Sequence, residues 1–168
     1  MATVALVVLV GAVTLLRTPD EPTTDPVAIA APTAEPVATR QAMIGEEARD
    51  GQLVFVVEEF GCSAKQPTGT ICTLRFTVKN ASSSPAMMLG RFQYLVDPQR
   101  RTYGADDVLT GAVPENGNRS LSELNINPEV MVPLTFVFDL PDGIEPAEAQ
   151  FRGTGRSRVG VSVRLERR

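Results

Sequence analysis

The sequence predicts an all-β fold: an immunoglobulin-like antiparallel β-sandwich of seven to eight strands, preceded by an apolar helix and a proline-rich linker. From residue 45 onwards, runs with an apolar residue at every second position are separated by turns rich in Gly, Pro, Asn and Asp. No run in this part has the apolar spacing of a convincing helix. Strands of this number and spacing close into a sandwich, with a barrel as the alternative.

The first two long strands are expected to form a hairpin with a disulfide near its turn. Residues 52–60 and 73–80 alternate apolar and polar side chains, and the two cysteines of the chain, Cys62 and Cys72, flank the turn between them. Nine residues separate the cysteines, so they do not form a Cys-x-x-Cys redox motif. We therefore predict a structural disulfide, which requires an oxidising compartment.

The remaining strands follow in chain order. Alternating runs predict strands at 91–96, 101–103, 130–140, 147–152 and 159–165. Pro133 has no backbone N–H, so the strand that contains it must lie at a sheet edge or at a bulge. Residues 45–51 are expected to form a polar entry turn, and 106–127 a long loop with one short edge strand.

The first 44 residues predict a membrane tether. Residues 1–16 form an apolar run, and Arg17 follows it. The length of this run suits a transmembrane anchor or a signal-peptide h-region. No small-x-small cleavage site lies close to Leu16, so an uncleaved anchor is favoured over secretion. Residues 17–44 hold five prolines and form a linker. The division is therefore anchor, linker and a domain at 45–168 on the extracytoplasmic side of the cell membrane.

Composition excludes several classes of function. The chain has no histidine, which removes Ser-His-Asp and Cys-His catalysis and histidine-ligated zinc. Two cysteines cannot build a four-thiolate zinc or iron–sulfur site within one chain. The net charge of -4 argues against nucleic-acid binding. We expect no cofactor and no enzymatic activity.

Three groups of side chains are candidates for a site. Acidic residues with hard oxygen ligands suggest calcium, against a plain solvated loop: Asp97, Asp106, Asp107 and Glu115. Soft sulfur ligands suggest copper, against simple core filling: Met87, Met88 and Met131. Basic residues near the C-terminus suggest anionic wall polymers or lipid headgroups, against solvent-facing strand positions: Arg152, Arg156, Arg158, Arg164, Arg167 and Arg168.

Motifs across residues 44–166 resemble a known family. They are Gly-Glu-x-x-x-Asp-Gly-Gln-Leu-x-Phe-x-Val from residue 45, Phe-Thr-Val-Lys-Asn from residue 76, Tyr-Leu-Val-Asp from residue 94, Ile-Asn-Pro from residue 126 and Phe-Asp-Leu-Pro from residue 138. Their order resembles the telokin-like immunoglobulin-fold domain of unknown function in secreted and anchored actinobacterial and Gram-positive proteins, which include a mycobacterial immunoprotective antigen.

The resemblance implies an extracytoplasmic β-sandwich with no catalytic residues to transfer. The family usually has Gly after Asn-Pro, where this chain has Glu129. Glutamate in a left-handed conformation carries a steric cost that glycine avoids, so the resemblance leaves a left-handed turn unexpected there.

Together these observations predict a non-enzymatic module that binds a protein or a cell-envelope component. The loop 106–125 is the expected contact surface, and its deletion is expected to leave stability nearly intact. One alternative is a small-ligand carrier, which needs an apolar cavity between the sheets. Another is a histidine-free hydrolase that uses Asp97 with Asp106 or Asp107 as a carboxylate pair.

Overall fold

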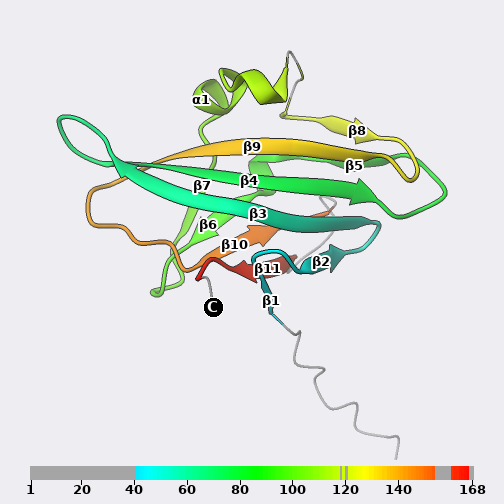
Figure 1. Cartoon of the computed structure of the whole chain (residues 1–168), viewed down its shortest axis with the longest axis horizontal. Helices are drawn as coiled ribbons and strands as arrows, with labels where there is room; N and C mark the ends of the chain where they lie inside the picture. Colours follow the sequence, from blue (N-terminus) through cyan, green and yellow to red (C-terminus); the bar gives the residue numbers. More distant parts are fainter. Residues whose placement is uncertain (1–40, 118, 120, 154–159, 167–168) are drawn as a thin grey trace, which may run out of the picture. The chain divides into compact units, whose positions relative to one another are not determined.

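The computed structural model describes residues 41–117, 119, 121–153 and 160–166, and these form an antiparallel β-sandwich (Figure 1). The predicted anchor, residues 1–16, and the linker up to residue 40 lie outside the described residues. Within the described ranges, no helix combines the length and apolar character needed to cross a membrane. The all-β prediction is confirmed for the domain.

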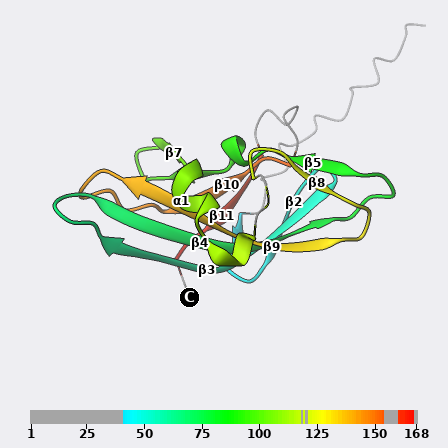
Figure 2. The same cartoon turned by 90° about the horizontal axis from the view of Figure 1, so that it is seen from above.

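The first sheet has five strands in the order β1-β11-β10-β6-β7. Their bounds are β1 Ala42–Met43, β6 Tyr94–Val96, β7 Thr102–Gly104, β10 Glu148–Phe151 and β11 Val161–Arg164. All pairs are antiparallel except β1 with β11, which is parallel. Figure 2 shows the short strands β7 and β10 to one side of the longer strands β3 and β4 of the second sheet.

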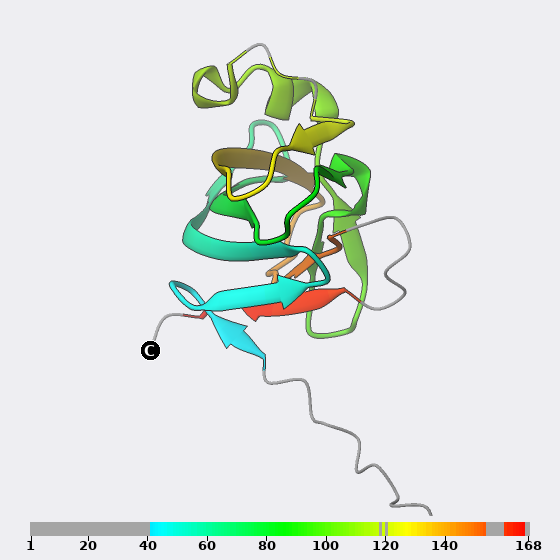
Figure 3. The same ribbon diagram turned by 90° about the vertical axis from the view of Figure 1, so that its right-hand side faces the viewer.

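The second sheet has four strands in the order β2-β3-β4-β9. Their bounds are β2 Glu47–Asp50, β3 Leu53–Ala64, β4 Thr70–Asn80 and β9 Met131–Leu140. A separate two-stranded ribbon joins β5 Ala86–Met88 to β8 Leu124–Ile126. Figure 3 shows the two layers end-on.

The core fills the space between the two sheets with phenylalanine rings. Phe55 stacks on Phe151 with ring centroids 4.7 Å apart, which joins the two layers directly. Phe76 meets Phe136 edge to face at 5.2 Å. The alternation predicted for β4 is confirmed, because its inward side chains are buried: Leu74, Phe76 and Val78. Aromatic pairs in these arrangements stabilise a core beyond the area that they bury.

The segment 45–51 was predicted as a turn, but its middle forms strand β2, with turns at residues 45 and 51. Gly45, with φ 86°, lets the chain bend between β1 in one sheet and β2 in the other. The Gly45 N–H donates to the carbonyl of Val57 and holds this bend against β3. Period-two alternation is weak here because the strands have only two and four residues, and β1 already lies within the last residues of the predicted linker.

Two further predictions differ from the structure. Residues 91–96 were expected to be one strand, but a 3₁₀ turn η1, Gly90–Phe92, precedes β6. The predicted loop 106–127 contains a short helix α1, Asp107–Gly111, and a 3₁₀ turn η2, Pro114–Asn116, before β8. The Asp106 side chain caps α1 by accepting from the Leu109 N–H at 2.8 Å. Only this capping aspartate signals the helix in the sequence.

Candidate functional site: the outer face of the second sheet

The β3–β4 hairpin presents its turn at one end of the outer face. Cys62 lies directly opposite Cys72 in the pairing of β3 with β4, and their sulfurs form a disulfide. Beyond the disulfide, the Lys65 N–H donates to the carbonyl of Gly69 at 2.9 Å and closes the turn. The Lys65 ammonium pairs with the Asp139 carboxylate on β9. The predicted disulfide is confirmed, and it holds a charged side chain at a defined place.

The segment α1–η2 is fastened to the free edge of β9 by buried polar side chains. The Thr110 hydroxyl accepts from the Val137 N–H at 2.9 Å and donates to its carbonyl at 3.3 Å. The Asn116 amide accepts from the Thr135 N–H at 2.9 Å and donates to its carbonyl at 2.7 Å. Each side chain therefore makes the two backbone hydrogen bonds that a neighbouring strand would otherwise make with β9.

The position of Pro133 follows from the same pattern. Alternate residues of a strand direct their backbone groups to the same side, so Pro133 shares the free side with Thr135. Its missing N–H costs no ladder bond there, which confirms the predicted edge position.

Deleting residues 106–125 would expose this edge and remove two buried polar side chains, Thr110 at 2% and Asn116 at 0% exposure. These contacts argue against the expectation that the deletion leaves stability nearly intact, and we now expect the deletion to destabilise the domain. Unpaired backbone groups at an edge also invite aggregation.

A groove lies between the α1–η2 segment and the sheet. Its floor is formed by outward side chains of β4 and β9, and its volume is about 570 Å³. The lining residues are Lys65, Ile71, Thr73, Asp106, Val108, Leu109, Val137 and Asp139. Thr73 also lines a second hollow of about 340 Å³, together with Glu59, Arg75, Val113, Glu115 and Thr135. We call these two neighbouring hollows, which share Thr73, the outer groove.

The wall of the outer groove exposes apolar side chains. Val108 is 80% exposed and Leu109 is 37% exposed, both on α1. Adjacent large apolar residues at the rim of a groove are typical of an interaction surface.

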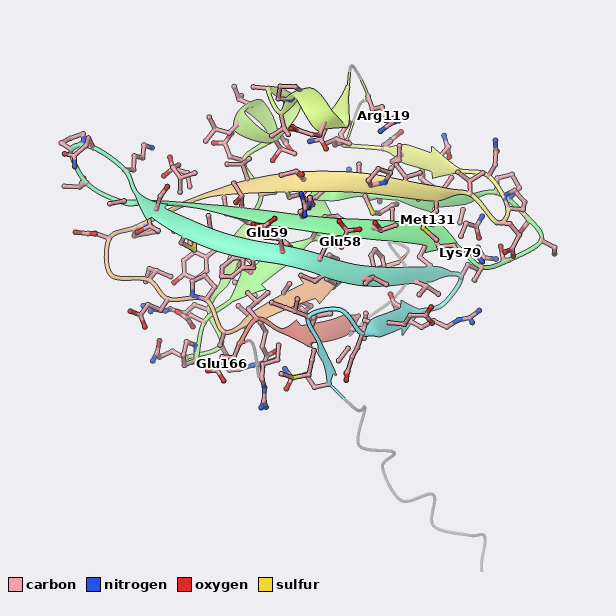
Figure 4. All side chains as sticks on the ribbon, viewed as in Figure 1. Glu58, Glu59, Lys79, Arg119, Met131 and Glu166 are labelled. Carbon is pink, nitrogen blue, oxygen red and sulfur yellow. A yellow bond between two sulfur atoms is a disulfide. The ribbon has the colours of Figure 1, made fainter. Side chains whose placement is uncertain are left out.

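Both cations of the outer groove are paired with carboxylates. Lys65 pairs with Asp139, and Arg75 lies 3.3 Å from Glu58 and 3.1 Å from Glu59. Figure 4 shows Glu58 and Glu59 on this sheet, with Lys79 and Met131 further along it.

A third hollow of about 180 Å³ lies near Lys79 and Met131. Lys79 forms a 2.7 Å ion pair with Glu129, which precedes β9. Glu129 has φ 59°, so its backbone is left-handed. That conformation was unexpected, because glutamate stands here where the similar family has glycine. The expectation of no left-handed turn is therefore wrong. The backbone explains the conformation, because the Glu129 N–H donates to the Asn80 carbonyl at 2.8 Å.

Asp97, predicted as a ligand or a catalytic acid, has a structural position in the β6–β7 turn. It is 2% exposed. Its carboxylate accepts from the Arg101 N–H at 2.9 Å, from the Arg101 guanidinium and from the Tyr103 hydroxyl at 3.0 Å. Burial raises the pKa of this carboxyl, but the hydrogen bonds from Arg101 and Tyr103 lower the pKa more, and the result lies below the ordinary value.

The other members of the acidic set do not join Asp97. Asp106 lines one half of the outer groove and Glu115 the other, while Asp97 lines none of the three hollows. Among the described residues, no three acidic or thiol side chains come together as a metal site. The calcium cluster is therefore not assembled in the described part of the domain, and the Asp97 carboxylate is held by Arg101 and Tyr103.

The sulfur and arginine candidates are also dispersed. Met88 is fully buried in the core, whereas Met87 and Met131 are 43% and 61% exposed. Arg152 packs its guanidinium over the Tyr94 ring at 5.8 Å, and Arg164 donates to the Gln41 side chain. The remaining C-terminal arginines lie outside the described residues: Arg156, Arg158, Arg167 and Arg168.

The carrier alternative requires an apolar cavity between the sheets. The three hollows described above lie on the outer face of the second sheet, and phenylalanine rings from both sheets pack against one another between the layers.

Comparison with known proteins shows the fold and no more. No family model matches the chain, and no match was found among curated proteins. The yjhA protein of Bacillus subtilis is 12% identical, with a TM-score of 0.55 over 75% of this chain and 100% of that one. MPT63, a secreted protein of Mycobacterium tuberculosis, is 15% identical, with a TM-score of 0.53 over 79% of this chain and 99% of that one. The chain shares their β-sandwich fold.

Sequence reasoning named part of this site and missed the rest. The loop 106–125 was the predicted contact surface, and its residues Val108, Leu109 and Val113 line the outer groove. The floor was missed, because Thr73 and Val137 appear in the sequence as ordinary outward positions of alternating strands. Only the pairing of β4 with β9 brings them together.

Proposed function

We propose that the chain is a non-enzymatic, extracytoplasmic, telokin-like immunoglobulin module that binds a partner through the outer groove. In this proposal residues 1–16 tether it to the membrane and the linker carries the domain away from the bilayer. The observation that carries the binding role is the exposed pair Val108 and Leu109, held at the rim of a groove. The clamps of Thr110 and Asn116 keep that rim fixed, which lowers the entropic cost of binding.

The extracytoplasmic location has two supports. The disulfide between Cys62 and Cys72 is the kind of bond that persists in oxidising compartments. MPT63, one of the structural neighbours, is a secreted protein. The motifs beginning at Gly45 and at Phe76 support the telokin-like assignment.

Site-specific photo-cross-linking tests the binding role in the full chain on intact cells that produce it. A photoreactive residue in place of Val108 is expected to capture a partner. The same residue in place of Glu166, which is exposed beside β11 and away from the groove, is expected to capture nothing specific. Equal adducts from both positions, or none from Val108, would overturn the proposal.

A further inference from the structure

The outer groove is apolar in one part and acidic in another, and this division indicates what it binds. At the apolar part, Ile71 and Val137 form the floor and Val108 and Leu109 the wall. At the other part, Glu59 and Glu115 line the hollow that shares Thr73 with the apolar part. A ligand that spans both parts must carry an apolar group beside a group that tolerates carboxylates.

Negative charge exceeds positive charge around the groove. Among the described residues that line it, four are acidic and two are basic: Glu59, Asp106, Glu115 and Asp139 against Lys65 and Arg75. Both basic groups already form ion pairs within the domain. Among the described residues, neither Asp106 nor Glu115 has an ion-pair partner. The surplus therefore remains available to a cation from outside.

We propose that the outer groove binds a polypeptide segment in which an aliphatic side chain stands next to a lysine or arginine. This inference rests on the proposed function and names its partner class. The aliphatic side chain lies over Ile71 and Val137 against Val108, and the cation faces Glu115. An acidic segment is repelled by the same carboxylates, and a second copy of the domain would bring two acidic faces together.

Three labelled peptides test the inference by fluorescence anisotropy with the full chain. They are repeats of Ser-Leu-Lys, Ser-Leu-Glu and Ser-Ser-Lys, which separate the apolar contribution from the charge. The Ser-Leu-Lys peptide is expected to bind tightest, and its affinity should fall several-fold between about 0.1 M and about 1 M salt, where screening shortens from ~10 to ~3 Å. Equal binding of the Leu-Lys and Leu-Glu peptides would overturn the inference.

Two variants with matched controls locate the binding. Val108→Ala with Leu109→Ala removes the apolar wall and is expected to weaken binding of the Leu-Lys peptide about tenfold. Val130→Ala, at an exposed apolar position that is 42% accessible and outside the groove, is expected to leave it unchanged. Glu115→Lys should weaken the same binding several-fold, whereas Glu166→Lys, with the same change of charge beside β11, should not. Equal losses in a variant and its control would place the site elsewhere.

The peptide series and the cross-linking distinguish a wrong partner class from a wrong binding role. If the Val108 position captures a partner on cells but the peptides show no preference for lysine over glutamate, the assignment to a basic segment is wrong while the proposed binding role stands. If Val108 captures nothing, the binding role fails first. Self-association that Val108→Ala with Leu109→Ala abolishes, in a chain that does not bind the Leu-Lys peptide, would assign the groove to a second copy and overturn the inference.

Discussion

Asn80 shows how one buried polar side chain can order a whole connection. It is fully buried at the end of β4. Its amide donates to the carbonyls of Ser84 and Ile126 at 2.8 and 2.9 Å, and its side-chain oxygen accepts from the Ser82 N–H at 3.1 Å. The loop after β4 and the β8 strand are thereby tied to one point. In this domain such side chains position loops that the apolar core does not reach.

Asp97 makes stability depend on acid in a defined direction. Its pKa in the folded state is lowered, so the ionised carboxylate stabilises the fold at pH values above its unfolded pKa, about 3.9. That contribution is lost as the pH falls through the lower pKa of the folded state. We expect Asp97→Asn to lower the urea midpoint at neutral pH and to flatten the decline of stability below about pH 4.

Urea titrations at several pH values check this prediction. Asp106→Asn, which changes an aspartate outside the β6–β7 turn, serves as the matched control. A decline of stability below pH 4 as steep in Asp97→Asn as in the wild type would contradict the role given to Asp97.

The left-handed backbone at Glu129 predicts that a glycine in its place stabilises the domain. A residue other than glycine in the left-handed region costs roughly 1–2 kcal/mol, while glycine adds roughly 0.5–1 kcal/mol of unfolded-state entropy to be overcome. Glu129→Gly is therefore expected to raise the free energy of unfolding by about 0.5–1 kcal/mol despite the loss of the exposed ion pair with Lys79. Glu129→Ala removes the same ion pair and keeps the strained backbone, so it should not stabilise. Equal unfolding midpoints for the two variants would show that the backbone is not the cause.

At the scale of elements, the edge strand β9 depends on side chains for its outer hydrogen bonds. Thr110→Val keeps the shape of the side chain but leaves the Val137 N–H, in a residue 7% exposed, without its acceptor. A buried unsatisfied donor costs roughly 1–3 kcal/mol. We expect that loss in chemical denaturation, together with faster aggregation from the uncovered edge. Thr102→Val, on exposed β7, is the control and should change stability little.

The β3–β4 hairpin predicts a second effect at this scale. Reducing the disulfide of the wild-type chain removes the cross-link while keeping both sulfurs in place. In the chain-entropy model, a loop this short contributes about 2–3 kcal/mol. Denaturation with and without reductant should therefore differ by about that amount. A Cys62→Ala, Cys72→Ala variant should show no response to reductant, and an equal response in that variant would refute the role of the bond.

The elements that the sequence predicts well are those whose alternation runs for many residues. Strands β3, β4 and β9 each have ten or more residues, and all three were predicted. The elements that the sequence did not predict are short. β1 and β2 are held by pairing with β11 and β3, and α1 by a cap and by the edge of β9. Elements held by tertiary partners show little apolar periodicity of their own, so the sequence pattern could not reveal these three.

For the whole molecule, the sandwich makes one face of the second sheet the place for binding. Its inner face packs against the first sheet, whereas its outer face carries the outer groove beside α1. The sequence predicts this binding face only in part. The floor and the rim of the outer groove come from residues more than thirty positions apart, such as Thr73 and Val108.

Hydrogen–deuterium exchange of the full chain, with and without the Ser-Leu-Lys peptide, shows which face of the domain binds. We expect slower exchange in residues 106–116 and at the β3–β4 turn, with β10 and β11 unchanged. Protection confined to β10 and β11, or no protection at all with the peptide in excess, would contradict the assignment of the outer groove as the binding surface.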